Sequence, residues 1–127
     1  IRSYYTGHWA AALDYYARAR AVFERTGDMW GASVCAGNSA EIFVEQGRLS
    51  EAIGPTRLAL RAAKVAGARS FVALWTAQLG RIALREGRHE EGLELLAQAH
   101  ETYEADGEAG SALVVQASSP LNTCITL

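Results

Sequence analysis

The sequence contains few residues that would point to a particular chemistry. Only two of its 127 residues are cysteine, Cys35 and Cys124, and neither has a second cysteine or a histidine at the spacing of a redox or metal-binding motif. Isolated cysteines of this kind are usually structural and stay reduced inside cells. We therefore expect buried or idle thiols in a reducing compartment.

Long apolar runs and a strong net charge are also missing. No stretch approaches the ~20 apolar residues of a membrane span, and no basic segment followed by an apolar one opens the chain. The formal net charge of -2 argues against nucleic acid as a partner. We expect a cytoplasmic protein with no membrane contact and no direct nucleic-acid contact. Because the chain begins at Ile1 and in the middle of a pattern, we also expect it to be part of something larger.

No catalytic constellation is evident in the sequence. It has no nucleophile, acid/base pair or metal cluster at a workable spacing, and its glycines do not cluster into a phosphate loop. One alternative is that His89 and His100 share a helix face with Glu90 or Glu101 and bind a metal, but solvated helix faces explain these side chains better. The sequence therefore predicts no enzyme activity, no cofactor and no metal site.

What the sequence does have is a glycine at every twentieth position, separated by segments with helical character. Glycine readily adopts the left-handed conformation that ends a helix, so we expect a turn within about two residues of each one and an all-α chain. The glycines are Gly7, Gly27, Gly47, Gly67, Gly87 and Gly107. After the tail of an earlier helix at 1–6, the predicted helices occupy residues 8–26, 28–46, 48–66, 68–86, 88–106 and 108–117.

A shift of forty residues aligns the sequence with itself. Small residues recur where two helices must approach closely, at Ala12, Ala52 and Gly92, and larger apolar residues recur three or four positions away on the same helix face. This spacing resembles the tetratricopeptide repeat, whose usual period is about 34 residues, so each helix here is nearly a turn longer. The resemblance implies an α-α superhelix, a solenoid of antiparallel helical hairpins with a forty-residue period.

The same register predicts the core, as stripes of apolar side chains along each helix. The expected core residues are Leu13, Tyr16, Ala19, Phe23, Val34, Ala40, Ile42, Phe43, Ile53, Leu60, Ala63, Phe71, Trp75, Leu79, Ile82, Leu93, Leu96, Ala99 and Tyr103. The pattern ends after Gln116. We therefore predict a helical repeat domain at 1–117 and an irregular C-terminal tail at 118–127.

Pro55 falls inside the predicted helix 48–66, where it removes one backbone hydrogen bond and crowds the carbonyl of Glu51. We expect a kink toward solvent, eased by Gly54. The alternative, that Pro55 begins the helix, conflicts with Ala52 and Ile53, which stand in register with the other repeats.

Charge is unevenly distributed along the chain. The segment 48–88 has eight basic and two acidic residues, whereas the segment from His89 onward has seven acidic residues and no lysine or arginine. Such a polarised surface can steer a partner or a neighbouring domain, although an ordinary charged solvent face explains it equally well.

Resemblance to the tetratricopeptide repeat also implies a binding surface, the concave groove lined by the first helix of each hairpin. Glutamates one helical turn apart would form an acidic strip on one hairpin, and arginines at the same spacing would form a basic strip on the next. The alternative is that the two strips pair with each other. The predicted groove residues are Asn38, Glu41 and Glu45 from one hairpin and Gln78, Arg81 and Arg85 from the next.

Beyond the repeat itself, segments 38–67 and 79–96 resemble a particular group of proteins. They are similar to the C-terminal tetratricopeptide region of bacterial, especially actinobacterial, signalling proteins with an adenylate/guanylate cyclase domain and an ATPase module, and to arrays in ATP-binding LuxR-type transcriptional regulators. The resemblance covers roughly residues 5–117. It implies a regulatory scaffold that binds a protein or peptide, or neighbouring domains of the same parent chain. The alternative is a stand-alone adaptor or a truncated gene product with no retained activity.

Overall fold

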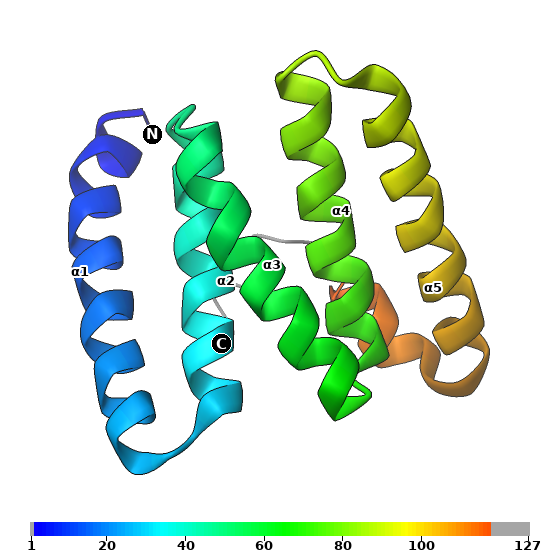
Figure 1. Cartoon of the computed structure of the whole chain (residues 1–127), viewed down its shortest axis with the longest axis horizontal. Coiled ribbons are helices and arrows are strands. Elements are labelled where there is room, and N and C mark those ends of the chain that lie inside the picture. Colours follow the sequence, from blue (N-terminus) through cyan, green and yellow to red (C-terminus); the bar gives the residue numbers. More distant parts are fainter. Residues whose placement is uncertain (1, 118–127) are drawn as a thin grey trace. The chain divides into compact units, whose positions relative to one another are not determined.

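The computed structural model describes residues 2–117, and within them the side chains of residues 8–105. This part of the chain consists of helices and contains no strand, which confirms the predicted all-α class (Figure 1). The predicted tail at 118–127 lies outside the described residues. The helices are α1 (Arg2–Thr26), α2 (Met29–Glu45), α3 (Leu49–Ala66), α4 (Arg69–Arg85) and α5 (His89–Ala117).

Four turns with the same backbone geometry separate these helices. Each contains one of the periodic glycines at positive φ, namely Gly27 at 81°, Gly47 at 78°, Gly67 at 70° and Gly87 at 87°. In every turn the N–H of the following residue donates to the carbonyl five positions back, at 2.8 or 2.9 Å. This bond satisfies a carbonyl that the end of the helix would otherwise leave without a donor. The four glycine turns predicted at these positions are confirmed.

The turns predicted at Gly7 and Gly107 are wrong. Helix α1 continues through Gly7, and α5 continues through Gly107. Glycine permits a left-handed turn but does not impose one, because its cost inside a helix is only about 1 kcal/mol relative to alanine. As a consequence α1 and α5 have 25 and 29 residues, whereas the helices between them have 17 or 18.

The chain divides into two compact units, Ile1–Ala62 and Ala63–Leu127. In the first unit, α1 packs against α2. Asp28 caps the start of α2 by accepting a hydrogen bond from the N–H of Gly31 at 2.9 Å. A Cβ at Gly31 would lie 2.9 Å from the ring of Phe23, so only glycine lets the aromatic ring of α1 lie against the first turn of α2.

In the second unit, α4 packs against α5 at a crossing formed by two glycines. A Cβ at Gly92 would lie 2.6 Å from Cγ of Leu84 and 3.0 Å from the carbonyl oxygen of Gly80. A Cβ at Gly80 would lie 3.1 Å from the carbonyl oxygen of Gly92 and 3.0 Å from Cγ of Leu96. The two backbones are therefore in direct contact, which confirms Gly92 as a close-packing position.

Of the small residues expected at helix contacts, Ala52, Ala59 and Ala99 are buried, whereas Ala12 and Ala19 are only partly buried. Trp75 and Ile82 are the largest fully buried apolar side chains. One predicted core residue is wrong, because Leu93 is 62% exposed. Gly92 faces α4. Because adjacent helical positions differ by about 100° around the axis, the next residue, Leu93, points away from α4.

Pro55 lies inside α3, which begins at Leu49, so the alternative that Pro55 starts the helix is wrong. The next residue, Thr56, is fully buried and its hydroxyl donates to the carbonyl of Ala52 at 2.8 Å. This side-chain bond goes to the carbonyl of Ala52 and not to that of Glu51, which is the carbonyl that loses its backbone donor to Pro55. The expected bend at Pro55 stays a prediction.

Alanine in place of Gly87 is expected to lower the free energy of unfolding by about 1–2 kcal/mol, since a Cβ is unfavourable in the left-handed region. A Cβ there would meet no other atom within 4 Å, so the loss reports backbone conformation alone. Asparagine, which tolerates this region better, should cost less than alanine. Urea unfolding followed by circular dichroism measures both, and equal stability of the alanine variant and the natural chain would contradict the prediction.

Candidate functional site

The predicted groove residues of the first unit lie on α2 and differ in exposure. Asn38 and Glu41 are buried, with exposed fractions of 1% and 6%, while Glu45 at the last turn of α2 is exposed. Both residues interact with other groups. A buried carboxylate requires such partners, because removing its charge from water is costly. Glu45 is therefore the acidic side chain of this set that solvent reaches.

The corresponding residues of the second unit lie on α4. Gln78 is fully buried, Arg81 is half-buried and Arg85 at the end of α4 is exposed. Burial raises the pKa of Tyr103 on α5, and the nearby guanidinium of Arg81 acts in the opposite direction. Arg81 therefore lies close enough to Tyr103 to act on it electrostatically. The acidic and basic strips belong to different units, and their joining into one groove stays a prediction.

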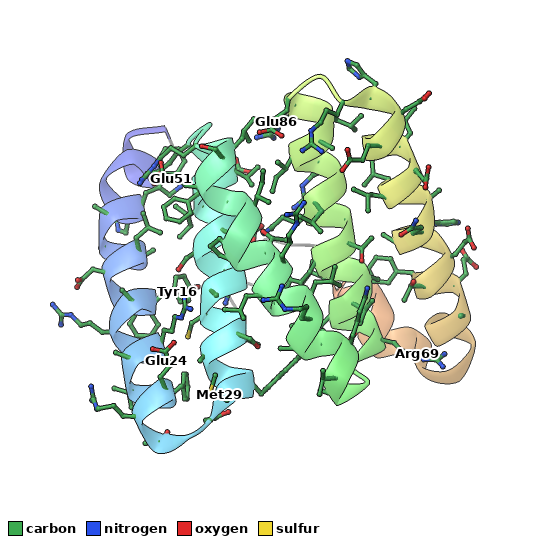
Figure 2. The ribbon with its side chains drawn as sticks, viewed as in Figure 1. Tyr16, Glu24, Met29, Glu51, Arg69 and Glu86 are labelled. Carbon is green, nitrogen blue, oxygen red and sulfur yellow. The ribbon has the colours of Figure 1, made fainter. Side chains whose placement is uncertain are left out.

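A cleft of about 440 Å³ lies within the first unit, between α1 and α2 beside Pro55 of α3. Its floor is mostly apolar, and Tyr16 and Glu24 of its α1 side are labelled in Figure 2. The charged groups at its edge are already paired. Arg20 contacts Glu24 at 3.1 Å.

Arg48, also at the edge of this cleft, lies over the ring of Phe43 at 4.5 Å and contacts Glu51 at 2.7 Å. The hydrogen bond from Arg48 lowers the pKa of the Glu51 carboxyl. Forty residues later Arg88 makes the corresponding contact with Glu91, and it also contacts Glu86. Arg48 and Arg88 therefore make their contacts at the turns that contain Gly47 and Gly87.

A second cleft, which we call the α4–α5 cleft, lies within the second unit and has a volume of about 530 Å³. Unlike the first, it carries cations without acidic partners: within the described residues no ion pair joins Lys64 or Arg69 to a carboxylate. Arg69 lies at the start of α4, at the opposite end of that helix from Glu86 (Figure 2). The residues that line the α4–α5 cleft are Lys64, Arg69, Val72, Thr76, Gln98, Glu101, Thr102 and Ala105.

Sequence reasoning missed the α4–α5 cleft, although the repeat register contains a signal for it. Forty residues before Thr76, Gln98 and Thr102 the sequence has Ala36, Leu58 and Ala62. Polar residues thus replace apolar ones at three positions that line the cleft. Aligning the repeats would have shown this change from apolar to polar residues, and it could have pointed to the cleft.

Cys35 is confirmed as a buried free thiol on α2. Burial raises its pKa, and the opposing charge of Arg20 is a smaller effect. A raised pKa disfavours the reactive thiolate, which agrees with a structural role for this cysteine. Cys124 lies outside the described residues.

His89 and His100 both lie on α5, eleven residues apart, which corresponds to about 16 Å along the helix axis. Such a separation is too large for two ligands of one metal ion, whose bonds are about 2 Å long. His100 instead lies 3.4 Å from the carboxylate of Glu104. Among the described residues no three His, Cys, Asp or Glu side chains come together in a way that could hold a metal.

No helix in the described part of the chain is both long and apolar enough to cross a membrane. Comparison with protein-family models, with curated proteins and with solved structures finds no match to this chain.

Proposed function

We propose that this chain is a protein-interaction scaffold of the tetratricopeptide type, working in the cytoplasm as the C-terminal regulatory region of a larger bacterial signalling protein. The parent would be of the adenylate/guanylate cyclase or LuxR type. The observation that carries the proposal is the set of four identical glycine turns twenty residues apart, each joining two helices. Arrays of repeated helical pairs present extended surfaces and act mainly by binding other proteins.

Within this proposal the side chains that contact the partner come from α2 and α4. Glu45 on α2 and Arg85 on α4 are exposed at the last turn of their helices, and Arg81 is half-exposed one turn before Arg85. Charges at the edge of an interface chiefly govern encounter rate and partner choice. We therefore assign Arg81 and Arg85 to recognition of an acidic surface on the partner.

The test begins with the open reading frame that contains this sequence. An in-frame cyclase or nucleotide-binding domain supplies the partner to be measured, and its absence would favour the stand-alone adaptor. Reversing Arg81 and Arg85 to glutamate should slow association with that domain about tenfold at low salt and weaken the salt dependence. Surface plasmon resonance measures the rate, and circular dichroism checks that the helices remain.

The matched control reverses Arg57 and Arg61, two exposed cations of α3 at the same spacing of four residues. It changes the net charge by the same amount and should leave the association rate close to that of the natural chain. The assignment is refuted when the α3 reversal abolishes binding and the α4 reversal does not.

A further inference from the structure

Helix α1 carries an apolar stripe that the described structure leaves accessible to solvent. Tyr15 is 65% exposed and Val22 is 46% exposed, while Ala12 and Ala19 are only partly buried. The later repeats bury the positions that correspond to these two alanines, namely Ala52, Ala59, Gly92 and Ala99. Contiguous exposed apolar surface often marks a site of contact with another protein.

The stripe has the spacing of a helix–helix interface. Ala12, Tyr15, Ala19 and Val22 follow one another at alternating intervals of three and four residues. At about 100° per residue, this spacing keeps the four side chains within an arc of about 80° on α1. Such a repeat lets two helices pack along their length, with each side chain entering a space between side chains of the other helix. We call the stripe the α1 seam, and with one further position at each end it consists of His8, Ala12, Tyr15, Ala19, Val22 and Thr26.

The order of large and small side chains makes the α1 seam complementary to itself. When two copies of α1 lie antiparallel across a two-fold axis at residue 17, residues at equal distances before and after residue 17 oppose each other. Tyr15 then opposes Ala19 of the second copy, and Val22 opposes Ala12 of the second copy. Each large side chain meets a small one, so the two helices can approach closely without a clash or a void.

The charges beside the α1 seam favour the same arrangement. Arg18 lies along one edge of the seam and forms an exposed ion pair at 2.9 Å with Asp14, one turn before it. Both residues are close to residue 17, so the antiparallel arrangement brings the ion pairs of the two copies together around the axis. Each arginine then lies within reach of both aspartates. The formal net charge of the chain is only -2, so repulsion between two copies is weak.

We propose that the α1 seam is a self-association surface, on which a second copy of this chain docks with its own α1 in the antiparallel direction. The contact is isologous, because both copies contribute the same residues, and it therefore closes at two copies. The inference goes beyond the scaffold function and does not rest on it, since the side chains assigned to partner recognition lie on α2 and α4.

Sedimentation equilibrium of the whole chain over a range of concentrations tests the proposal. We expect a reversible equilibrium between monomer and dimer. A chain that stays monomeric at millimolar concentration would overturn the proposal, because the α1 seam would then belong to a different occupant. Assembly beyond the dimer would also overturn it, since an isologous contact leaves no further site open.

Two double variants show whether the α1 seam makes the contact. Tyr15→Glu combined with Val22→Glu places charges at exposed positions of the seam and should weaken dimerisation roughly tenfold or more, with the helix content unchanged by circular dichroism. The control, Met29→Glu combined with Val65→Glu, makes the same change at two exposed apolar side chains outside the seam and should leave the dimer unchanged. Equal weakening in both variants would show non-specific apolar association and would overturn the proposal.

Charge exchange tests the arrangement around the axis. Asp14→Arg places four positive charges there and should weaken dimerisation several-fold. Asp14→Arg combined with Arg18→Asp exchanges the two charges and should restore it. Dimerisation that is indifferent to Asp14→Arg, or that the exchange does not restore, would contradict the position of the axis at residue 17.

Cysteine cross-linking tests the antiparallel direction. Ala12 opposes Val22 of the second copy, so a mixture of an Ala12→Cys chain with a Val22→Cys chain, both carrying Cys124→Ser, should give mainly the mixed covalent dimer on oxidation. A parallel arrangement would instead join two chains of the same variant. Such products as the main species would overturn the antiparallel contact.

Discussion

Alanine at position 75 is expected to lower the free energy of unfolding by about 3–5 kcal/mol, the range typical of removing a buried aromatic side chain. Trp75 is 1% exposed, is the largest fully buried side chain of the described structure, and lies beside Phe71 with ring centroids 6.2 Å apart. The neighbours cannot collapse fully into the space that the indole leaves. Urea unfolding followed by far-ultraviolet circular dichroism gives the value without depending on tryptophan fluorescence.

Phenylalanine at the same position is the matched control. The indole N–H of Trp75 has no hydrogen-bond acceptor in the described structure, so Trp75→Phe removes volume but breaks no hydrogen bond. It should cost about 1–2 kcal/mol, clearly less than alanine, because most of the apolar surface stays buried. Equal losses for the two variants would show that the indole nitrogen, and not the packing of the ring, stabilises this part of α4.

The second large effect is expected at the glycine crossing of α4 and α5. Valine at position 92 should lower the free energy of unfolding by about 3 kcal/mol, at the upper end of the range for overpacked sites. Its Cβ would overlap Cγ of Leu84 and press on the carbonyl of Gly80. Alanine should cost about 1 kcal/mol, because its higher helix propensity, worth about 1 kcal/mol over glycine, offsets part of the strain.

A double-mutant cycle separates strain from helix propensity. When Leu84 is already alanine, the side-chain atoms that would clash with a Cβ at position 92 are absent. Gly92→Ala should then be less destabilising in the Leu84→Ala background than in the natural chain, a favourable coupling of about 1 kcal/mol. Additive effects of the two substitutions would mean that the two helices separate freely and that the crossing imposes no strain.

The parts of the fold that were predictable from the sequence depend on local chemistry. A helix end with a left-handed residue strongly favours glycine, so Gly27, Gly47, Gly67 and Gly87 could be placed from spacing alone. The same rule was wrong at Gly7 and Gly107, since whether a glycine ends a helix depends also on the packing of the segment that follows. A periodic pattern contains no information on that packing.

The core was predictable where the repeat supplies a neighbouring helix and not elsewhere. Ala59, Ala99 and Trp75 are buried as expected, whereas Leu93 has the same position in the register as Leu13 and Ile53 but is exposed. The register gives the face of the helix, and only the three-dimensional arrangement gives the helix that covers it.

The candidate sites were less predictable for a related reason. The groove residues were chosen from their face on α2 and α4, yet Asn38, Glu41 and Gln78 are buried and make or require contacts that a helical pattern does not reveal. In the α4–α5 cleft, Lys64 and Arg69 form no ion pair within the described residues. Whether a charged side chain forms an ion pair depends on which groups the fold places beside it, and no sequence motif gives that arrangement.

The four glycine turns have a consequence for how such a gene can change in length. Each joint is closed by the same backbone hydrogen bond and a glycine at positive φ, so all four joints share one backbone geometry although their side-chain contacts differ. Unequal recombination between two glycine codons forty residues apart would duplicate or delete one complete hairpin in frame. Every new junction would reproduce a turn that the chain already contains, so growth of the gene by whole hairpins requires no new loop to evolve.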